Sequence, residues 1–405
     1  MAVVLIGTLD TKGLELGFVR DILRGRGLET LVVDVGTLGP PRIEPDIDRG
    51  QVLLAAGTSE AESRSIGDRG TAVTAAARGA AIVLQRLHAA GRVDAVLAIG
   101  GGAGTTIGAT AMRALPFGVP KVMVSTLASG QVRPFVGGSD IMMLHSVADL
   151  AGLNRLTRSV LANAAHAVVG MVSMKVTDAG EGEDRPLIAA TMFGVTTPCV
   201  DRAREALEAA GYEVLVFHAT GSGGEAMEGL IRDRKFAAVL DLTTTELADE
   251  LVGGILSAGP DRLEAAGRAG LPQVISLGAL DMVNFGPRHT VPERFAHRRF
   301  HIHNENVTLM RTTAEECAVI GTRMAEILGR SRGPVVLMLP VGGVSALDVP
   351  GGPFHDPAAD QALFDAIRGG LAGRSTVELI ERPEPINDPA FADEAARALQ
   401  RIIVS

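Results

Sequence analysis

The sequence predicts an α/β protein made of two Rossmann-like domains, each a parallel sheet covered by helices, with a cleft between the domains. Short apolar runs rich in Val, Ile and Leu alternate with Ala-rich helical stretches along the chain. This alternation is typical of parallel sheets with helices on both faces. A charged, Gly-containing segment at 175–185 precedes a second start of the same pattern. We therefore expect domains at residues 1–182 and 183–405.

In the first half, four apolar runs predict buried strands, because each is short, nearly all apolar and bounded by Gly, Asp or Ser. The strands are expected at residues 3–6, 30–34, 93–99 and 121–125. Stretches with polar faces predict helices at residues 14–26, 70–90, 105–115 and 154–172. The segment at 175–185 is rich in acidic residues and glycine, and we expect a solvated linker or edge loop there.

In the second half the same reasoning predicts six strands and five helices. The strands are expected at residues 187–192, 214–217, 238–242, 273–276, 335–339 and 377–381. The helices are expected at residues 199–210, 224–234, 314–329, 358–367 and 391–402. The stretch from 277 to 307 is irregular. A single eight-stranded barrel is the alternative architecture, and both this stretch and the linker disfavour it.

The two halves can be aligned with one another, which indicates one domain-sized unit present twice. The matched segments are 5–33 with 190–217, 94–99 with 237–242, and 118–124 with 270–276. Because identity between the halves is low, a shared fold pattern without common ancestry stays open.

Composition excludes several classes of function. The chain has 405 residues and a net charge of −9, which disfavours binding to nucleic acid or to an anionic membrane surface. Aromatic residues make up only 3%, too few for a surface that stacks single-stranded bases. No apolar run approaches ~20 residues, so we expect no membrane span. Cys199 and Cys317 share no short motif, and we expect a cytoplasmic protein with reduced thiols.

The first candidate site is the motif at residues 7–13, which follows the first predicted strand. Gly7 would permit a tight turn, and the backbone N–H groups of the following helix start favour an anion. Lys12 could pair with a phosphate, and Asp10 could hold Mg²⁺ or a ribose hydroxyl. The spacing is not that of the common phosphate-binding loop. The alternative is a capped helix with a solvated lysine.

Two further motifs follow the third and fourth predicted strands. Residues 100–106 contain four glycines, more than a plain turn needs, and successive N–H groups before a helix suit a chain of phosphates. The glycine spacing does not match the dinucleotide fingerprint, which argues against NAD. Residues 125–130 offer hydroxyl groups to a phosphate or a base edge. Close backbone packing and ordinary turns are the respective alternatives.

The second half holds a segment rich in arginine and histidine, at residues 288–311. It could bind an anion, form a basic surface or, with His297 and His301 four residues apart, hold a metal; plain packing is also open. His303, Asn304 and Arg311 could donate to a phosphate or a carboxylate. The loop at 340–356 would approach the cleft, and the glycines at 220–224 would form a second phosphate cradle or a flexible loop.

Together these segments resemble an uncharacterised bacterial family related to the ATP-binding amino-terminal region of the tomato mosaic virus resistance protein. The resemblance covers nearly the whole chain. The segments that carry it are residues 7–13, 100–106, 124–130, 139–140, 151–154, 303–313 and 342–356, in the same order. The resemblance implies two α/β domains, ATP with Mg²⁺ bound mainly by the first of them, and dimers.

The sequence thus predicts a protein that binds ATP and Mg²⁺, an enzyme acting on a small anionic metabolite in the interdomain cleft, and a homo-oligomer. An ATP-independent lyase or hydrolase of a phosphorylated or carboxylated metabolite and a nucleotide-gated protein-interaction module are the alternatives. No catalytic residue is assigned. The expected nucleotide site comprises Gly7, Thr8, Asp10, Thr11, Lys12, Gly100, Gly101, Gly102, Gly104, Thr105, Thr106, Ser125 and Thr126, with Asp10 as the metal ligand. The expected substrate site comprises His303, Asn304, Arg311, Gly342, Gly343 and Ser345.

Overall fold

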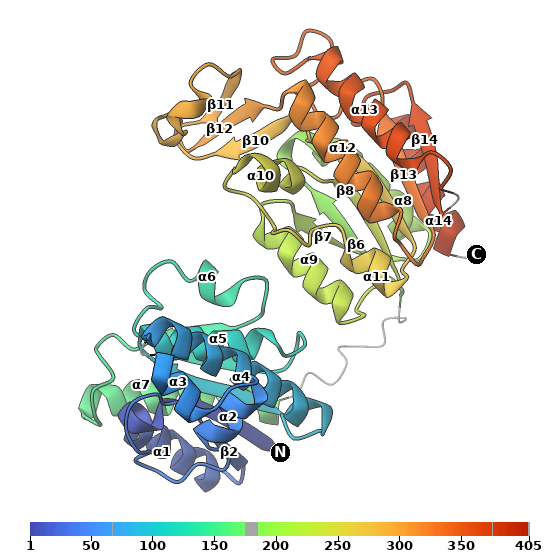
Figure 1. Ribbon diagram of the computed structural model, residues 1–405. Helices are drawn as coiled ribbons and strands as arrows, with labels where there is room; N and C mark the ends of the chain where they lie inside the picture. Colours follow the sequence, from blue (N-terminus) through green and yellow to red (C-terminus); the bar gives the residue numbers. More distant parts are fainter. Residues whose placement is uncertain (67, 175–184, 375, 404–405) are drawn as a thin grey trace. The chain divides into compact units, whose positions relative to one another are not determined.

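The structure is a computed structural model that describes residues 1–66, 68–174, 185–374 and 376–403. The chain divides into two compact units, Met1–Gly180 (unit 1) and Glu181–Ser405 (unit 2), and each is described by itself. Each unit has a parallel sheet covered by helices, so the predicted α/β class with two Rossmann-like domains is confirmed (Figure 1). The segment predicted as a linker lies outside the described residues, apart from Arg185. The predicted cleft between the domains stays a prediction.

Unit 1 contains a five-stranded parallel sheet in the order β2-β1-β3-β4-β5. Its strands are β1 (Ala2–Gly7), β2 (Glu29–Asp34), β3 (Ala95–Gly100), β4 (Lys121–Ser125) and β5 (Met142–His145). Four of them were predicted. The fifth, β5, was not, because it lies at the edge of the sheet and is only half-buried, so its sequence lacks the continuous apolar run of a central strand.

Helices cover both faces of this sheet, and each face has its own apolar core. One core lies under α1 and α7, and the other under α4 and α5. The helices of unit 1 are α1 (Leu9–Gly25), α2 (Arg49–Ala55), α3 (Glu60–Ile66), α4 (Arg69–Ala89), α5 (Gly102–Arg113), α6 (Arg133–Val136) and α7 (Arg155–Ser173). Both α1 and α5 begin earlier than predicted. The motif residues after β1 and β3 therefore lie in first helical turns rather than in long loops.

Unit 2 contains a six-stranded parallel sheet in the order β14-β13-β9-β8-β6-β7. Its strands are β6 (Leu187–Met192), β7 (Glu213–His218), β8 (Ala238–Thr243), β9 (Gln273–Gly278), β13 (Val335–Pro340) and β14 (Val377–Arg382). The order β7-β6-β8-β9 repeats the order β2-β1-β3-β4 of unit 1. The alignment of the two halves seen in the sequence therefore corresponds to a shared sheet topology.

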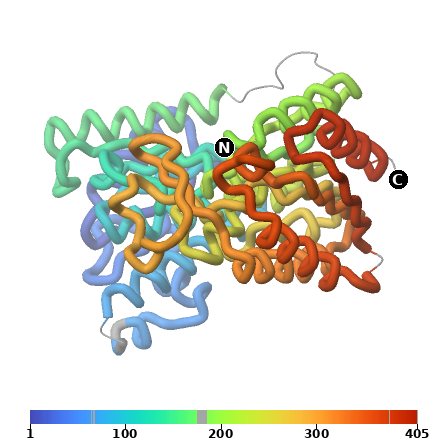
Figure 2. The backbone as a smooth tube through the Cα atoms, turned by 90° about the horizontal axis from the view of Figure 1, so that it is seen from above, coloured from blue at the N-terminus to red at the C-terminus, as the bar shows by residue number. Residues whose placement is uncertain are grey.

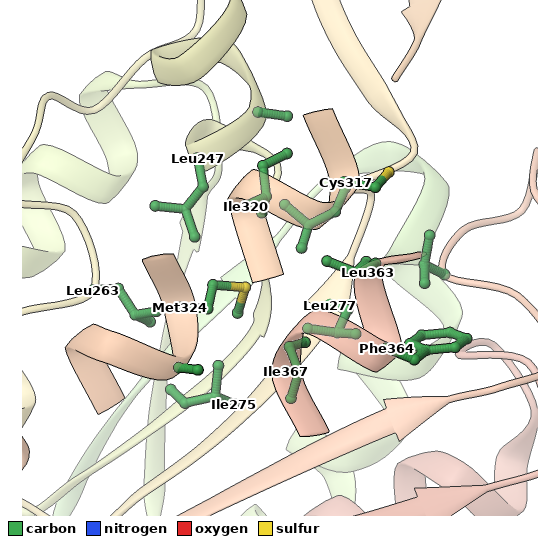
Figure 3. Close-up of a cluster of buried hydrophobic side chains, with 14 of the residues drawn as sticks. Leu247, Leu263, Ile275, Leu277, Cys317, Ile320, Met324, Leu363, Phe364 and Ile367 are labelled. Atoms are coloured by element: carbon green, nitrogen blue, oxygen red, sulfur yellow. The ribbon is translucent and has the colours of Figure 1, made fainter. Parts of the chain in front are cut away.

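The larger core of unit 2 lies between one face of this sheet and the helix pair α12–α13. Figure 3 shows Ile320 and Met324 of α12 beside Leu363 of α13, above Ile275 of β9. Helices α8 and α14 cover the opposite face. The helices of unit 2 are α8 (Thr197–Ala209), α9 (Ser222–Arg232), α10 (Glu246–Val252), α11 (Ala265–Ala269), α12 (Ala314–Leu328), α13 (Pro357–Leu371) and α14 (Pro389–Ile403).

A three-stranded antiparallel sheet forms from the stretch that the sequence left irregular. Its order is β10-β12-β11, with β10 (Met282–Phe285), β11 (Phe300–Asn304) and β12 (Val307–Arg311). β10 and most of β12 are buried, whereas β11 becomes exposed along its length. These strands are short, and packing within unit 2 stabilises them. Local sequence patterns therefore do not predict them.

Candidate functional site

A pocket of about 210 Å³ lies at the carboxyl ends of β1 and β3 in unit 1. In the order β2-β1-β3-β4, successive connections leave these two strands toward opposite sides, and open α/β sheets bind ligands at such a switch point. The pocket brings together the first turns of α1 and α5, the loop after β2 and the start of α4. Its lining residues are Thr8, Asp10, Thr11, Lys12, Val35, Thr37, Leu38, Arg69, Val73, Gly101, Gly102, Ala103, Gly104 and Ile107.

Two helix starts meet at this pocket without side-chain caps. The N-cap residues are Thr8 for α1 and Gly101 for α5, and neither side chain caps its helix. The Thr8 hydroxyl instead lies 2.7 Å from the hydroxyl of Thr11. Two first-turn donors of α1 are satisfied by the protein, because the backbone N–H of Leu9 donates to Asp34 Oδ1 at 3.0 Å and that of Thr11 donates to Thr8 O at 3.0 Å. The remaining first-turn N–H groups carry partial positive charge and favour an anion.

The glycines after β3 serve two different purposes. A Cβ at Gly100 would lie 2.6 Å from the Cα of Gly104, so close contact between β3 and α5 requires Gly100. A Cβ at Gly102 would meet no atom within 4 Å, and one at Gly101 would make only an ordinary contact with Thr126. Packing thus explains Gly100 and leaves Gly101 and Gly102 unexplained. A ligand that touches the backbone would account for both.

Several residues predicted for the nucleotide site lie outside the pocket lining, and their hydroxyl groups form hydrogen bonds within the protein. The hydroxyl groups of Thr105 and Ser125 are fully buried and lie 2.7 Å apart. Ser125 also accepts the N–H of Leu127 at 2.9 Å. The exposed Thr106 hydroxyl donates to Gly102 O at 3.1 Å, as helical threonines commonly do. These residues hold the turn after β4 and the start of α5.

Gly7 and Thr126 also lie beside the pocket rather than in its lining. Gly7 is the last residue of β1 and its φ is not positive, so the tight turn through Thr8 does not require a glycine at this position. The chain needs only Thr8 between β1 and α1. Thr126 N–H donates to Gly100 O at 3.3 Å.

Asp10 has one engaged carboxylate oxygen and one unpaired oxygen. Its Oδ2 accepts the N–H of Leu38 at 2.8 Å and that of Gly39 at 3.1 Å, which fixes the loop after β2. Its Oδ1 is buried and has no hydrogen-bond partner within the described part of the chain. A buried carboxylate oxygen needs a cation or a donor. Mg²⁺ is commonly held by one or two carboxylates together with substrate phosphates, so a single unpaired oxygen here fits that ion.

In residues 1–66, 68–174, 185–374 and 376–403, no group of three or more His, Cys, Asp or Glu side chains is arranged to hold a metal ion by itself. The predicted role of Asp10 as a metal ligand therefore depends on a metal that arrives with its phosphate ligand. The pair His297 and His301, weighed above as metal ligands, is separated by a turn: His301 lies in β11, whereas His297 precedes that strand.

Two cationic side chains line the pocket. Lys12 is half-buried and its ammonium donates to Leu150 O at 2.5 Å, which leaves two further donors on the same nitrogen. Arg69 is the first residue of α4 and is exposed, and the sequence analysis did not select it. Because Arg69 is far from both motifs in the sequence, only the fold places it beside them.

The corresponding crevice of unit 2, at the carboxyl ends of β6 and β8, is filled by a buried ionic network. Arg262 is fully buried, donating to Asp241 at 2.5 and 2.8 Å and to Glu246 at 2.7 Å. Glu246 also accepts the N–H groups of Gly221 at 2.7 Å and Gly224 at 3.1 Å. Burial raises the pKa of Glu246, and Arg262 opposes that shift. The predicted phosphate cradle at 220–224 thus already holds a carboxylate of the protein.

Of the residues predicted to bind a substrate, Arg311 and Ser345 come together around Asp281 and Asp348, where the protein itself engages both side chains. Arg311 is 3% exposed and donates to Phe354 O at 2.8 Å, to Thr312 Oγ1 at 2.8 Å and to Asp360 Oδ1 at 2.6 Å. Its carboxylate partner is Asp360 rather than Glu315, the structural partner considered in the sequence. As a substrate anchor, Arg311 stays a prediction that these contacts disfavour.

The remaining five residues of that set are divided between a buried loop and an exposed strand end. Ser345 is buried and donates to Asp281 Oδ2 at 2.8 Å. A Cβ at Gly342 would lie 2.6 Å from Pro383 O, and one at Gly343 would overlap Asp348 O, so both glycines are required by packing. His303 and Asn304 are exposed at the end of β11.

A cluster of buried carboxyl groups surrounds Arg311. Burial raises the pKa of Asp281 to about 7, and the neighbouring carboxylate of Asp348 adds to the shift. The same two causes raise the pKa of Asp360 to about 7. The guanidinium of Arg311 lowers both pKa values, but they remain above the usual pKa of an aspartate. This cluster holds the loop after β13 against β12 and is not part of the pocket in unit 1.

Comparison with known proteins identifies relatives along the whole chain. A protein of Clostridium tetani is 49% identical over 98% of both chains, and one of Rhizobium meliloti is 48% identical over 99% of this chain and 98% of its own. The ToMV resistance protein Tm-1(GCR237) of Solanum lycopersicum is 39% identical over 96% of this chain but only 54% of its own length. This chain therefore spans about half of the tomato protein.

Solved structures with a related arrangement are distant. A putative UDP-N-acetylglucosamine 2-epimerase from Listeria monocytogenes aligns with 15% identity and a TM-score of 0.25, over 68% of this chain and 78% of the other. A Streptomyces glycosyltransferase, SsfS6, complexed with thymidine diphosphate, aligns with 13% identity and a TM-score of 0.17. Scores this low support no inference about function.

The match to a protein family is direct. Residues 1–177 match the N-terminal domain of an uncharacterised protein family, UPF0261, and residues 185–403 match its C-terminal domain. The chain therefore belongs to the UPF0261 family, and the tomato Tm-1 proteins are among its homologues.

Proposed function

We propose that this protein binds ATP with Mg²⁺ in the pocket of unit 1 and is an enzyme that uses the nucleotide on a small anionic metabolite. The observation that carries the proposal is the meeting of two uncapped helix starts at the switch point of the sheet, beside Gly102, whose Cα faces open space. The family resemblance supports ATP as the ligand.

The pocket offers separate positions for the parts of a nucleotide. Backbone N–H groups at residues 101–104 would hold phosphate oxygens, and Lys12 and Arg69 would supply positive charge. The unpaired Oδ1 of Asp10 would contact Mg²⁺, which neutralises phosphate charge when bound. The apolar side chains of Leu38 and Val73 form the accessible part of the lining suited to the base.

The contrast between the two units supports a nucleotide in unit 1 rather than in unit 2. In unit 2 the carboxyl ends of β6 and β8 already hold Arg262, which is paired with Asp241 and Glu246. In unit 1 the equivalent strand ends, those of β1 and β3, border a pocket of about 210 Å³. A cytoplasmic location and a homo-oligomeric state remain part of the proposal. In the described part of the chain, no helix is both long and apolar enough to cross a membrane.

Calorimetric titration of ATP with Mg²⁺ and with a chelator tests the binding step. The parent chain should bind ATP more tightly when Mg²⁺ is present. Gly102→Val should abolish binding, because its side chain would occupy the space beside the phosphate-binding N–H groups. Gly170→Val is the matched control, since Gly170 is also a helical glycine with no neighbour within 4 Å. Equal ATP affinity in the Gly102→Val variant and the parent would place the nucleotide elsewhere.

The catalytic step is tested separately. Release of ADP or phosphate from ATP should be slow alone and should accelerate when a panel of carboxylated or phosphorylated metabolites is added. Gly102→Val should remove the acceleration. Turnover of a metabolite without ATP would favour the lyase or hydrolase alternative, and ATP binding with no turnover across the panel would favour the interaction module.

A further inference from the structure

A smaller cavity adjoins the pocket of unit 1. Its volume is about 20 Å³, room for one small chemical group, and it shares the lining residues Val35 and Thr37 with the pocket. Val73 of α4 lines the pocket, and Ala76, one helical turn later, lines the cavity. Helices α2 and α3 contribute to its wall, and Figure 2 shows α2, α3 and α4 (blue) close together in unit 1. The cavity is thus an extension of the pocket along α4.

Arg49 brings an unsatisfied hydrogen-bond donor to this cavity. It is the first residue of α2 and is 8% exposed. Its Nε donates to Asp34 Oδ2 at 2.9 Å, and its Nη2 lies 2.9 Å from the same oxygen. Nη2 is nevertheless buried without a well-directed hydrogen bond in the part of the chain that the structure describes. Because Nη2 carries two N–H groups and at most one can face Asp34, at least one buried donor needs another acceptor.

The carboxylate that faces Arg49 is already engaged. Asp34 Oδ1 accepts the N–H of Leu9 at 3.0 Å and that of Gly36 at 2.8 Å, and its Oδ2 accepts Arg49 Nε. In dinucleotide-binding sheets an acidic residue near this position binds the ribose, but here the protein itself engages both oxygens. No described residue accepts from Arg49 Nη2, so its acceptor is a water or a ligand that enters from the pocket.

The lining of the cavity also presents hydrogen-bond acceptors. Glu60 of α3 contributes a carboxylate, which can accept from more than one donor, and Thr37 and Ser63 contribute hydroxyl groups. A donor beside acceptors matches adenine, whose N6 amino group lies next to a ring nitrogen on both edges, N1 on one and N7 on the other. Guanine has the carbonyl oxygen O6 in place of that amino group, and the carboxylate of Glu60 would repel it. The cavity has no room for the ring, so only the edge of the base would enter.

We propose that this cavity recognises the adenine base of the nucleotide that unit 1 is proposed to bind. Arg49 Nη2 donates to a ring nitrogen of the base, and Glu60 accepts a hydrogen bond from the N6 amino group. The ring would lie in the pocket, against the apolar side chains of Leu38 and Val73. The inference rests on the proposed nucleotide site, but it concerns the base alone, and the phosphates would bind without it.

Calorimetric titration of the full chain separates the base from the phosphates. The ligands are ATP, GTP, inorganic tripolyphosphate and two ATP analogues that lack N1 or N7, each with Mg²⁺. ATP should bind at least about tenfold more tightly than GTP or tripolyphosphate. One of the two analogues should bind about tenfold more weakly than ATP, because it leaves the buried N–H of Arg49 without its acceptor.

Each other outcome of this ligand series contradicts a different step. Equal binding of ATP and tripolyphosphate would overturn the base site and leave the phosphate site standing. Equal binding of ATP and both analogues would overturn the contact with Arg49, and tighter binding of GTP than of ATP would overturn the choice of adenine. Binding of neither ATP nor tripolyphosphate would contradict the nucleotide site itself.

Filling the cavity tests the same inference through the protein. Ala76→Val adds two methyl groups at the cavity wall and should lower the affinity for ATP about tenfold without changing that for tripolyphosphate. Ala72→Val, on the same helix but outside both linings, is the matched control and should bind ATP like the parent. ATP affinity that is equal in Ala76→Val and Ala72→Val would overturn the proposal.

A change at Arg49 tests the donor itself. Arg49→Lys keeps a cation beside Asp34 but lacks the guanidinium N–H groups, so it should weaken binding of ATP and not of tripolyphosphate. Circular dichroism checks that each variant is folded, and the ligand series on the parent chain is decisive if a variant is not. Parent-like preference for ATP over tripolyphosphate in Arg49→Lys would remove Arg49 from the base site.

Discussion

Glu246 Oε1 accepts the backbone N–H of Gly221 at 2.7 Å, so a carboxylate of the protein itself closes the start of α9. Glu246 also pairs with Arg262, so a buried ion pair occupies the carboxyl ends of β6 and β8, whereas the equivalent ends of β1 and β3 in unit 1 border a pocket of about 210 Å³. The two units thus share a strand order but differ at the place where a ligand binds in this kind of sheet. In unit 2 buried side chains of the protein occupy this place, whereas in unit 1 it forms an open pocket.

Replacing Lys12 by alanine should weaken ATP binding by about 1–2 kcal/mol, the value of a charge-assisted hydrogen bond to phosphate. The measurement is calorimetric titration in Mg²⁺. Lys12 also donates to Leu150 O, so thermal unfolding must be followed in parallel to separate a loss of stability from a loss of affinity. Lys235→Ala, at an exposed lysine of unit 2, is the control. Unchanged affinity in Lys12→Ala would remove this residue from the site.

Arg69→Ala should also lower ATP affinity, by about threefold to tenfold, because Arg69 lines the pocket from the start of α4 but is exposed and screened by solvent. Arg92→Ala removes an exposed arginine of unit 1 that is not in the lining and should leave the affinity unchanged. If Arg69→Ala and Arg92→Ala bind ATP with the same affinity, the loss of one positive charge, rather than the position of Arg69 in the lining, explains the change in affinity. The decrease in ATP affinity with increasing salt concentration should be smaller in Arg69→Ala than in the parent.

Asp10→Asn should reduce the contribution of Mg²⁺ to ATP binding. An asparagine can keep its oxygen toward the N–H groups of Leu38 and Gly39, and its amide nitrogen then replaces the unpaired Oδ1. An amide nitrogen is not a ligand for Mg²⁺. Titrations with and without a chelator should therefore differ less than in the parent. A parent-like dependence on Mg²⁺ would show that the metal is held without Asp10.

Local sequence patterns predicted the parts of the pocket that follow strands directly. Thr8, Lys12 and Gly102 each lie within a few residues of a strand end, so an apolar run followed by glycines and a helix start was enough to find them. Arg69 and Leu38 come from other segments, and only the sheet order places them in the same lining. The sequence gives no local sign of that proximity.

The surroundings of Arg311 in unit 2 also depend on contacts between segments that are far apart in the sequence. Arg311 was expected to meet a ligand because its planar guanidinium can donate two parallel hydrogen bonds to a carboxylate or a phosphate. Its actual partner, Asp360, lies 49 residues later in the sequence and is brought close by packing of α13. Strands β10 and β11 likewise have too few residues for periodicity to distinguish them from loop.

Arg262→Met should destabilise unit 2 by about 3–5 kcal/mol, because it leaves the buried carboxylates of Asp241 and Glu246 without their cation. Urea unfolding followed by circular dichroism measures the change. Arg268→Met is the matched control, since Arg268 is a neighbouring arginine whose side chain is 67% exposed, and it should change the stability little. A small effect of Arg262→Met would mean that these carboxyl groups are neutral in the folded protein.

The stability of unit 2 should fall as the pH rises from about 4 to about 7. Burial raises the pKa of Asp281 to about 7, with a further contribution from Asp348. In the unfolded chain this carboxyl group ionises near pH 4. Between these values the folded chain binds more protons than the unfolded chain, so the free energy of unfolding decreases with pH, by at most about 1.4 kcal/mol per pH unit for one group, and levels off above about pH 7.

Asp281→Asn isolates this group. The asparagine oxygen can accept a hydrogen bond from the Ser345 hydroxyl, and its NH₂ group takes the position of the unpaired Oδ1. The variant therefore carries no negative charge at this buried site at any pH. The variant should match the parent near pH 5 but unfold at higher urea near pH 8, because only the parent must ionise a buried carboxyl group there. Asp261→Asn, at an exposed position of unit 2, should follow the parent at every pH.

Asp360 shares the cluster and its pKa is also raised to about 7, so Asp281→Asn should reduce the pH dependence without abolishing it. Parallel curves for Asp281→Asn and the parent across this range would show that Asp281 does not take up the proton.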